Sequence, residues 1–302
     1  MGIIEQIINA LMMGTLYALM AVGLSLIFGV LKLVNFAHGE ALMIGGYIFY
    51  FLATSFLVKN MGMPLPIILL ATIPFLYLTG IIIEKYFIRD AFQRKMARFE
   101  EYVILMTFML SIFMQNLVLP IFGPYNRQPP TIYEGYIQIG GLIISGERII
   151  AAVFALIIIT VFLLFLYKTY LGKGLRAVAQ NPDSAAVTGI DVAKMRTMAF
   201  GIGICLSGLA GALLGPVFLV SPTMGISFAI KAFVIVVIGG MGSIKGSIIA
   251  AYLLAMVESL GSLFFLDPSR AMAYREAYGL LLLILILSIR PQGLFGELER
   301  RA

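Results

Sequence analysis

Apolar runs of about 18 to 25 residues recur along the whole chain, and they constrain its fold more than any other feature. A run of this length can cross the hydrocarbon core of a bilayer as a single helix. Hydrophobic residues make up 61% of the 302 residues and charged residues only 12%, against about 25% in soluble domains. A large soluble core would need more polar surface than this, so the sequence predicts an all-α polytopic membrane protein.

About nine transmembrane helices are expected, within a range of eight to ten, and residues 1–302 are expected to form one transmembrane domain. The runs are 7–30, 39–58, 65–84, 101–120, 149–167, 196–220, 227–241, 246–266 and 276–290. Residues 227–266 leave two alternatives open, either two short helices or a broken re-entrant hairpin. The second and eighth runs share a Gly-rich entry and a later Tyr, which raises an inverted repeat as a possibility, although their spacings differ.

The basic residues predict the orientation of these spans. Of the 21 Lys and Arg residues, 15 lie in the segments that follow spans one, three, five, seven and nine. Because Lys and Arg concentrate on the cytoplasmic side, the N-terminus is expected outside and the C-terminus in the cytoplasm. This distribution accounts for the net charge of +6, so no nucleic-acid partner is expected.

The longest outer segment is the extracytoplasmic loop 120–148. Gly140 and Gly141 stand there between "YIQI" and "LIIS", which is the signal of a two-residue β-hairpin. The loop has two open interpretations, an ordered contact for an external partner or a passive connection.

A short polar helix is predicted at residues 181–189, between two long apolar runs. Asn181 is a suitable N-cap, Pro182 fits the first helical position and Gly189 provides a C-terminal stop. So short a helix is not stable alone, so other contacts must stabilise it. It is either an amphipathic linker on the membrane surface or a docking element that exposes the small residues Ala185, Ala186 and Thr188, with Arg176 and Asp183 orienting the contact.

Four motifs, in order over residues 7–296, resemble those of ABC-importer permeases of the branched-chain amino-acid (LivH-type) family. They are "GLSLIFGVLKLVNFAHGEALMIGGY" at 23–47, "GLRAVAQNPDSAAVTGID" at 174–191, "KAFVIVVIGGMGSIKGSIIAAYLL" at 231–254 and "RPQGLFG" at 290–296. The resemblance implies that segment 172–191 is a cytoplasmic coupling segment that docks on an ATPase subunit. The residues carried over to that role are Gly174, Arg176, Ala177, Asn181, Pro182, Asp183, Ala185, Ala186 and Gly189.

The resemblance also implies the partners and the location of the protein. They are a second permease subunit, related but not identical, two cytoplasmic ATPase subunits and an extracytoplasmic substrate-binding protein, assembled in the inner membrane. ATP and Mg²⁺ would bind to the ATPases and no cofactor to this chain. The sequence agrees, because "GGMGSIKGS" at 239–247 places Lys245 before Gly246 and does not make a GxxxxGK[ST] phosphate loop.

Polar and glycine residues within the spans supply candidates for a substrate pathway. Ionisable groups in a membrane are costly and often functional, and glycine breaks can expose backbone groups to an amino acid. The candidates are Asn35, His38, Gly39, Glu40, Gly239, Gly240 and Glu258. Helix capping is the alternative role for the "NFAHGE" residues, and a buried, paired acid is the alternative for Glu258.

A row of small residues with a spacing of four follows one face of the sixth span. It contains Ala199, Gly203, Ser207, Gly211 and Gly215. Such a row allows close helix packing, either inside the subunit or at a moving or dimeric interface.

Three functions remain open after this. The first is a transmembrane subunit of an ABC importer for leucine, isoleucine or valine, working by alternating access. The second is the same kind of importer for urea or another amino acid. The third is an ion-coupled secondary transporter. A membrane enzyme has no support, because one His, one Cys and scattered acids form no catalytic or metal-ligand set.

Overall fold

Helices make up nearly all of the structure, a computed structural model that describes residues 2–55, 64–93, 98–131, 135–139, 142–261, 263 and 274–296. In chain order the elements are α1 (Ile3–Leu31), α2 (His38–Thr54), α4 (Leu65–Ile83), the π-helical turn η1 (Glu84–Ile88), α5 (Arg89–Gln93), α6 (Phe99–Phe122), β1 (Tyr136–Ile139), β2 (Leu142–Ser145), α7 (Gly146–Lys168), α8 (Tyr170–Gln180), α9 (Pro182–Val187), α10 (Val192–Phe218), α11 (Met224–Gly239), α12 (Ile244–Gly261) and α14 (Arg275–Ile289).

Each predicted span coincides with a helix of this order. Six are long and apolar enough to cross a membrane, namely Ile3–Leu31, Leu65–Phe92, Phe99–Phe122, Gly146–Lys168, Val192–Phe218 and Ile244–Gly261. Helices α11 and α14 are shorter apolar helices. The chain is therefore an all-α polytopic membrane protein. The predicted ends of the second and eighth spans, at 58 and 266, lie outside the described residues.

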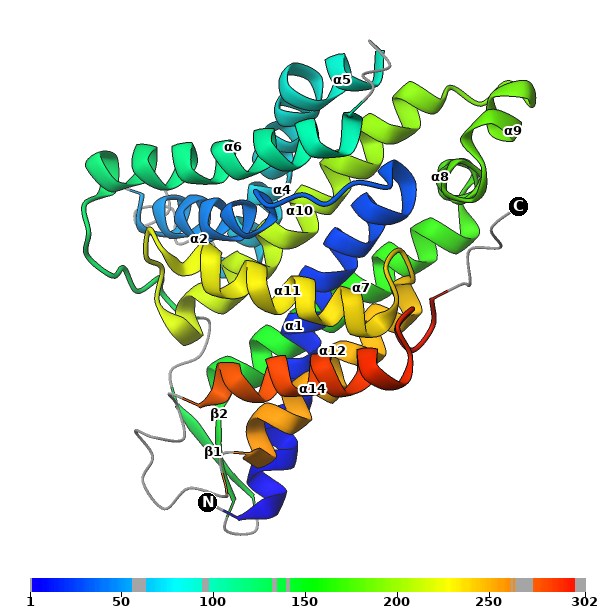
Figure 1. Cartoon of the computed structure of the whole chain (residues 1–302). Helices are drawn as coiled ribbons and strands as arrows, with labels where there is room; N and C mark the ends of the chain where they lie inside the picture. The colour runs from blue at the N-terminus through cyan, green and yellow to red at the C-terminus, as the bar shows by residue number, and fades with distance from the viewer. Residues whose placement is uncertain are drawn as a thin grey trace.

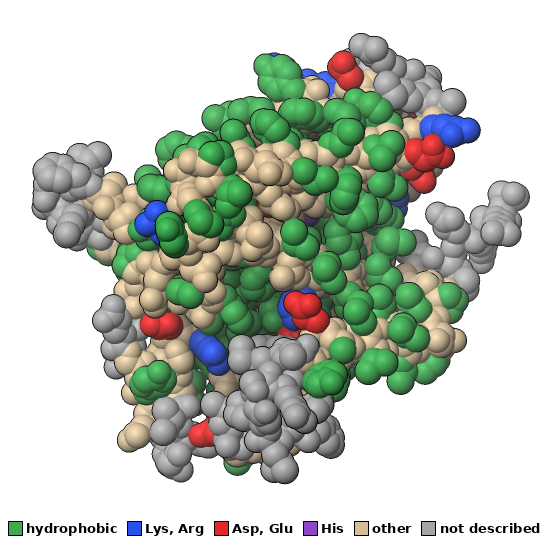
Figure 2. Space-filling model, turned by 60° about the vertical axis from the view of Figure 1, so that its left-hand side comes forward, with side chains coloured by type: hydrophobic (Ala, Val, Ile, Leu, Met, Phe, Trp, Pro, Cys, Tyr) green, Lys and Arg blue, Asp and Glu red, His purple; other side chains and the backbone are tan. Residues whose placement is uncertain are grey.

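Helices α1 and α10 form the centre of the domain, and α2, α4, α11 and α12 pack around them (Figure 1). The apolar stretches of α1 and α10 are each 89% buried, whereas those of α6 and α7 are only 22% and 28% buried. Figure 2 shows a face covered mainly by apolar side chains, with few charged ones. The outer helices thus present apolar surface where lipid would lie, as expected of a membrane domain.

Close backbone contacts between glycines allow the central helices to approach one another. Gly45 of α2 lies against the backbone of Gly208 in α10, and Gly211 of α10 lies against Leu42 of α2. Gly203 of α10 meets Gly23 and Ile27 of α1. The five small residues of the α10 row are all buried within this chain.

The ambiguous segment 227–266 forms two helices, α11 and α12, joined by a tight turn. Gly240 and Gly242 take positive φ angles of 96° and 87°, which residues with a side chain rarely adopt. The tail after α14 folds back on this turn, where the Leu294 and Phe295 amides donate to the Ile238 and Gly239 carbonyls at 2.8 and 3.1 Å.

The predicted β-hairpin is confirmed. Strands β1 and β2 pair antiparallel, with Ile139 opposite Leu142, while residues 140 and 141 lie outside the described residues. A second link fastens the outer loop to the end of α10, because Arg127 and Val220 exchange two backbone hydrogen bonds of 2.8 and 2.7 Å.

The third span does not end at residue 84 as predicted. The helix continues through η1 into α5, so Lys85 and Arg89 lie on helix and not in a loop. The buried carboxylate of Glu84 accepts hydrogen bonds of 2.9 Å from Arg89 and from Thr197 of α10. These contacts stabilise the extension, which a scan for apolar runs does not detect because the residues are polar.

Candidate functional site

The segment 172–191 contains two helices at the end of the molecule opposite the N-terminus and the β-hairpin (Figure 1). Helix α8, with Thr169 as its N-cap, was not predicted and precedes the predicted short helix. Helix α9 begins as expected, because the Asn181 side chain accepts the Ser184 amide at 2.9 Å and Pro182 follows it. Gly189 ends the turn with a φ of 84°. The local sequence thus forms a well-capped helix at a protruding site.

One predicted feature of α9 is wrong. Ala185 was expected to be exposed, but it is buried, because it is on the face that packs toward α8 and α10. Ala186 and Thr188 are exposed as expected, and between them Val187 is 89% exposed. Val187 is the most exposed apolar side chain of α9, and it was not among the small residues predicted for a contact.

The two charged residues proposed to orient that contact differ in their surroundings. Asp183 is exposed in the first turn of α9. Arg176 is half-buried on α8 and stacks over the Tyr167 ring at 5.0 Å. Arg176 therefore attaches α8 to the end of α7, while Asp183 faces outward. Gly174 and Ala177 are also half-buried on α8.

The residues of "NFAHGE" form a buried polar cluster at the start of α2. His38 is fully buried, and its Nε2 lies 3.1 Å from the Met20 carbonyl of α1. Ser207 of α10 donates to the His38 carbonyl at 3.0 Å. Asn35 caps the turn, because its side-chain oxygen accepts the Ala37 amide at 3.1 Å. The contacts of His38 fix the α2 entry against α1 and α10, while the Asn35 contact is local to the turn before α2.

Glu40, in the first turn of α2, lies between α2, α6 and α11 beside this polar cluster. Its Oε1 accepts hydrogen bonds from Ser111 at 2.9 Å and Gln115 at 2.6 Å, both on α6. Its Oε2 has no hydrogen-bond partner among the described residues and lies beside Gly225 of α11, where Gly39 also meets Gly225. The first turns of α2 and α11 therefore converge on one buried carboxylate.

Glu258 is the paired acid that the sequence allowed. It is buried in α12, forms an ion pair with Lys231 of α11 and accepts a hydrogen bond of 3.0 Å from the Tyr17 hydroxyl of α1. Sequence reasoning missed Lys231 as its partner. The available signal was its position, seven residues after the start of α11 and eight before its end, where a lone base in an apolar helix needs a counter-charge.

The remaining pathway candidates, Gly239 and Gly240, belong to the turn between α11 and α12. Gly239 lies against Gly246, and Gly240 lies against the Gly296 backbone of the tail. Both are buried in the described structure, so they shape a turn on which the C-terminal segment packs.

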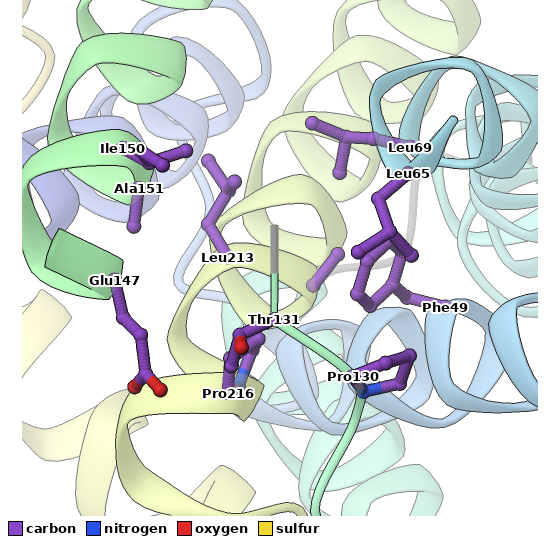
Figure 3. Close-up of a pocket in the computed structure, with 11 residues that line it drawn as sticks. Phe49, Leu65, Leu69, Pro130, Thr131, Glu147, Ile150, Ala151, Leu213 and Pro216 are labelled. Carbon is purple, nitrogen blue, oxygen red and sulfur yellow. The ribbon is translucent and has the colours of Figure 1, made fainter. Parts of the chain in front are cut away.

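A small cavity lies between α2, α4, α7 and α10 (Figure 3). Its walls are mainly apolar, with Phe49, Leu69 and Leu213 among them, and Thr131 and Glu147 are its polar residues. Its volume of about 30 Å³ exceeds the roughly 10–15 Å³ that one water molecule needs and is far below the roughly 300 Å³ at which ligand pockets begin. The cavity is therefore too small for a branched-chain amino acid in the present conformation.

Comparisons with known proteins agree with the sequence motifs. A profile of the family described as "Branched-chain amino acid transport system / permease component" matches residues 6–289. The high-affinity branched-chain amino acid transport system permease protein BraD of Pseudomonas aeruginosa is 31% identical over 98% of this chain and 96% of its own length. LivH of Salmonella typhimurium is 29% identical over the same shares, 98% and 96%. A probable LivH of Methanocaldococcus jannaschii is 27% identical over 95% and 91%.

The family match extends over all the apolar helices from α1 to α14 and includes the α8–α9 segment and the buried polar clusters. Proteins of this family are permease subunits that work with ATPase and substrate-binding partners. The chain therefore belongs to the family of permease components of branched-chain amino acid transport systems, and it is a multi-pass transport subunit of the inner membrane.

Proposed function

We propose that this chain is the transmembrane subunit of an ATP-binding-cassette importer for branched-chain amino acids. The observation that carries the proposal is the family match over residues 6–289, together with relatives of the same length that are named for this transport. The exposed, capped helix α9 supports it, because an importer of this class needs a surface that receives the movement of separate ATPases.

The mechanism follows from where α9 is attached. The helix is short and protrudes, and its buried residue Ala185 rests on the membrane domain. Asp191 caps α10 by accepting the Lys194 amide at 3.0 Å, so the chain passes from α9 into the central helix with only four residues between. ATP-driven closure of two ATPases would displace α9, and α10 would carry that displacement into the core, where alternating access takes place.

The full assembly in this proposal contains a second, related permease, two ATPases and an extracytoplasmic binding protein. This chain would span the membrane nine times, with the N-terminus outside and the C-terminus in the cytoplasm. The arrangement in Figure 1 supports that orientation, because the N-terminus and the β-hairpin lie at one end and α8 and α9 at the other. Basic residues concentrate at the α8–α9 end, as the positive-inside rule requires.

An inverted repeat is part of the same proposal, with α1, α2, α4 and α6 corresponding to α10, α11, α12 and α14. Helix α2 packs on α10 as α11 packs on α1, and α4 packs on α10 as α12 packs on α1. Both first helices end in a residue of positive φ, Lys32 at 54° and Leu219 at 66°. Gly39 and Gly225, each the second residue of its helix, touch one another. Spans two and seven correspond in this scheme, and not spans two and eight.

Uptake into proteoliposomes tests the proposal. The vesicles would hold this chain with its partner permease and ATPases, with the binding protein and radiolabelled leucine outside. We expect uptake only when ATP and Mg²⁺ are enclosed, and no uptake when an ion gradient replaces ATP. Uptake that follows an ion gradient without ATP would support the secondary transporter and refute the importer. ATP-dependent uptake of urea, without leucine uptake, would keep the importer and change its substrate.

A further inference from the structure

A buried ion pair lies between three helices of the permease at a place where packing alone does not require it. Lys231 of α11 pairs with Glu258 of α12, and their side chains are 13% and 1% exposed. The Tyr17 hydroxyl of α1 donates to the second carboxylate oxygen at 3.0 Å, and the Lys231 ammonium lies over the Tyr17 ring at 5.4 Å. The cluster thus holds one positive and one negative group in contact.

Stability does not explain such a pair. The desolvation of two charges offsets most of their attraction, and apolar residues of similar size often stabilise a buried site equally well. In a membrane both charges are costlier still, and residues of this kind line substrate pathways. Lys231 lies near the middle of the apolar helix α11, seven residues after its start and eight before its end. The position of Lys231 inside an apolar helix therefore indicates a role in function and not in stability.

The residues around Lys231 indicate what kind of ligand binds there. Its side chain is partly accessible, while Glu258 behind it is covered. On the same helix, Ile226 and Ile230 are 46% and 49% exposed, and Ser227 is exposed one turn before Lys231. Helix α11 has 16 residues, about 24 Å of helix, which is shorter than the hydrocarbon thickness of about 30 Å. Lys231 thus keeps some exposure on a short helix, with the exposed Ser227 on the same helical face, whereas Ile226 and Ile230 point about 140° and about 100° away from it.

We propose that Lys231 and Glu258 form a binding site for the zwitterionic head of an α-amino acid on its way through the membrane. Lys231 binds the substrate carboxylate, and Glu258 binds its ammonium group. Tyr17 is a positioning residue that keeps Glu258 in place by its hydrogen bond. This inference rests on the proposed function, because it needs an amino acid as the transported substrate.

The physical advantage of the site is that no charge is left alone. If Lys231 and Glu258 simply separated, each would remain as an uncompensated charge in a medium of low dielectric constant, which is strongly unfavourable. A zwitterion placed between them gives each group a new partner of opposite charge. The ion pair then re-forms when the substrate leaves, which returns the site to the state described here. Neutral solutes and single ions lack this compensation, so the site favours amino acids.

The test uses the complete importer in proteoliposomes, with leucine uptake and ATP hydrolysis measured on the same samples. The double variant K231M/E258Q removes both charges without leaving either one unpaired. We expect it to insert, and its ATP hydrolysis to remain stimulated by leucine-loaded binding protein, while leucine uptake falls at least tenfold. K245M is the matched control, because Lys245 is an exposed base at the start of α12, and its uptake should stay within twofold of the wild type.

A charge reversal separates recognition from a structural role. The variant K231E/E258K restores an ion pair, so a purely structural contact would recover uptake. Recognition predicts that uptake stays at least tenfold reduced, because the reversed pair would bind the zwitterion turned end for end, with its side chain pointing in the opposite direction along the pathway. Uptake within twofold of the wild type in either double variant would overturn the inference.

Two further outcomes are distinguishable. If a double variant fails to insert, K231R and E258D keep both charges and shift them slightly, and they should lower uptake while the assembly stays intact; unchanged uptake in both would refute the site. If the wild-type importer moves no amino acid with ATP, the proposed function itself fails. If the wild type moves leucine and the double variant does too, only the present inference fails.

Discussion

Individual glycines determine how closely the central helices approach. A Cβ added at Gly45 would overlap the backbone of Gly208, whose atoms cannot rotate away as a side chain would. Gly29, in α1, differs, because a Cβ there would stand 3.4 Å from the Gly242 carbonyl oxygen, which is an ordinary contact. Two glycines in buried helices thus have different structural requirements that sequence spacing does not separate.

We expect Gly45→Ala to destabilise the domain by roughly 1–3 kcal/mol, the usual cost of overpacking a well-packed interior. The measurement is the thermal unfolding of the purified permease in detergent, followed by loss of the monodisperse fraction. Gly29→Ala is the matched control and should leave the midpoint nearly unchanged. Equal midpoints for the two variants would show that α2 and α10 can separate at no cost, contrary to their packing.

At the scale of elements, α9 is positioned by its neighbours and not by its own stability. A six-residue helix gains little from its own hydrogen bonds. It forms because Asn181 caps its start, Gly189 ends it and Ala185 is buried against neighbouring helices. The opposite face is exposed, and Val187 is its most exposed apolar residue.

We expect Val187→Asp to weaken the binding of the ATPase subunit about tenfold, which corresponds to about 1.4 kcal/mol. In the proposed docking, a charge would replace an exposed apolar side chain on the face of α9 opposite Ala185. The affinity of the purified ATPase for the permease in nanodiscs provides the measurement. Arg98→Ala is the control, because Arg98 is exposed at the start of α6 and away from α9, and it should bind as the wild type does. Unchanged affinity of Val187→Asp would place the ATPase elsewhere.

At the scale of the whole molecule, the two ends of the protein carry different structural elements and different numbers of basic residues. One end holds the N-terminus, the β-hairpin and the loop that Arg127 fastens to α10. The other end holds α8 and α9, and most of the basic residues lie near this end. A protein with such ends has one stable orientation in the membrane, because moving the basic end across the bilayer is unfavourable.

Labelling of single cysteines checks this orientation. In a Cys205→Ala background, Tyr125→Cys should react with a membrane-impermeant maleimide on intact cells, because Tyr125 is 72% exposed on the outer loop. Val187→Cys should react only after the membrane is permeabilised. Each position serves as the control for the other. The reverse pattern would invert the topology and remove α9 from the cytoplasm.

The sequence by itself determined the features that depend on neighbours along the chain. An apolar helix stands at each of the predicted spans, and, apart from the third span, which continues past residue 84, the described ends lie within a few residues of the predicted ones. The Gly140-Gly141 pair predicted the hairpin, and Asn181, Pro182 and Gly189 predicted the limits of α9. The four motifs predicted the family. In each case the signal lies within a few residues, where backbone geometry and capping are local.

Tertiary structure alone decided which distant residues meet. Burial of Ala185 depends on helices outside α9, and the extension of α4 beyond residue 84 depends on Thr197 of α10. The partner of Glu258 is 27 residues away and on another helix, and the Tyr17 hydroxyl comes from the start of the chain. Helix periodicity shows which faces are apolar, but in a membrane nearly all faces are. The packing of helices, and so the ion pair between them, follows only from the folded arrangement.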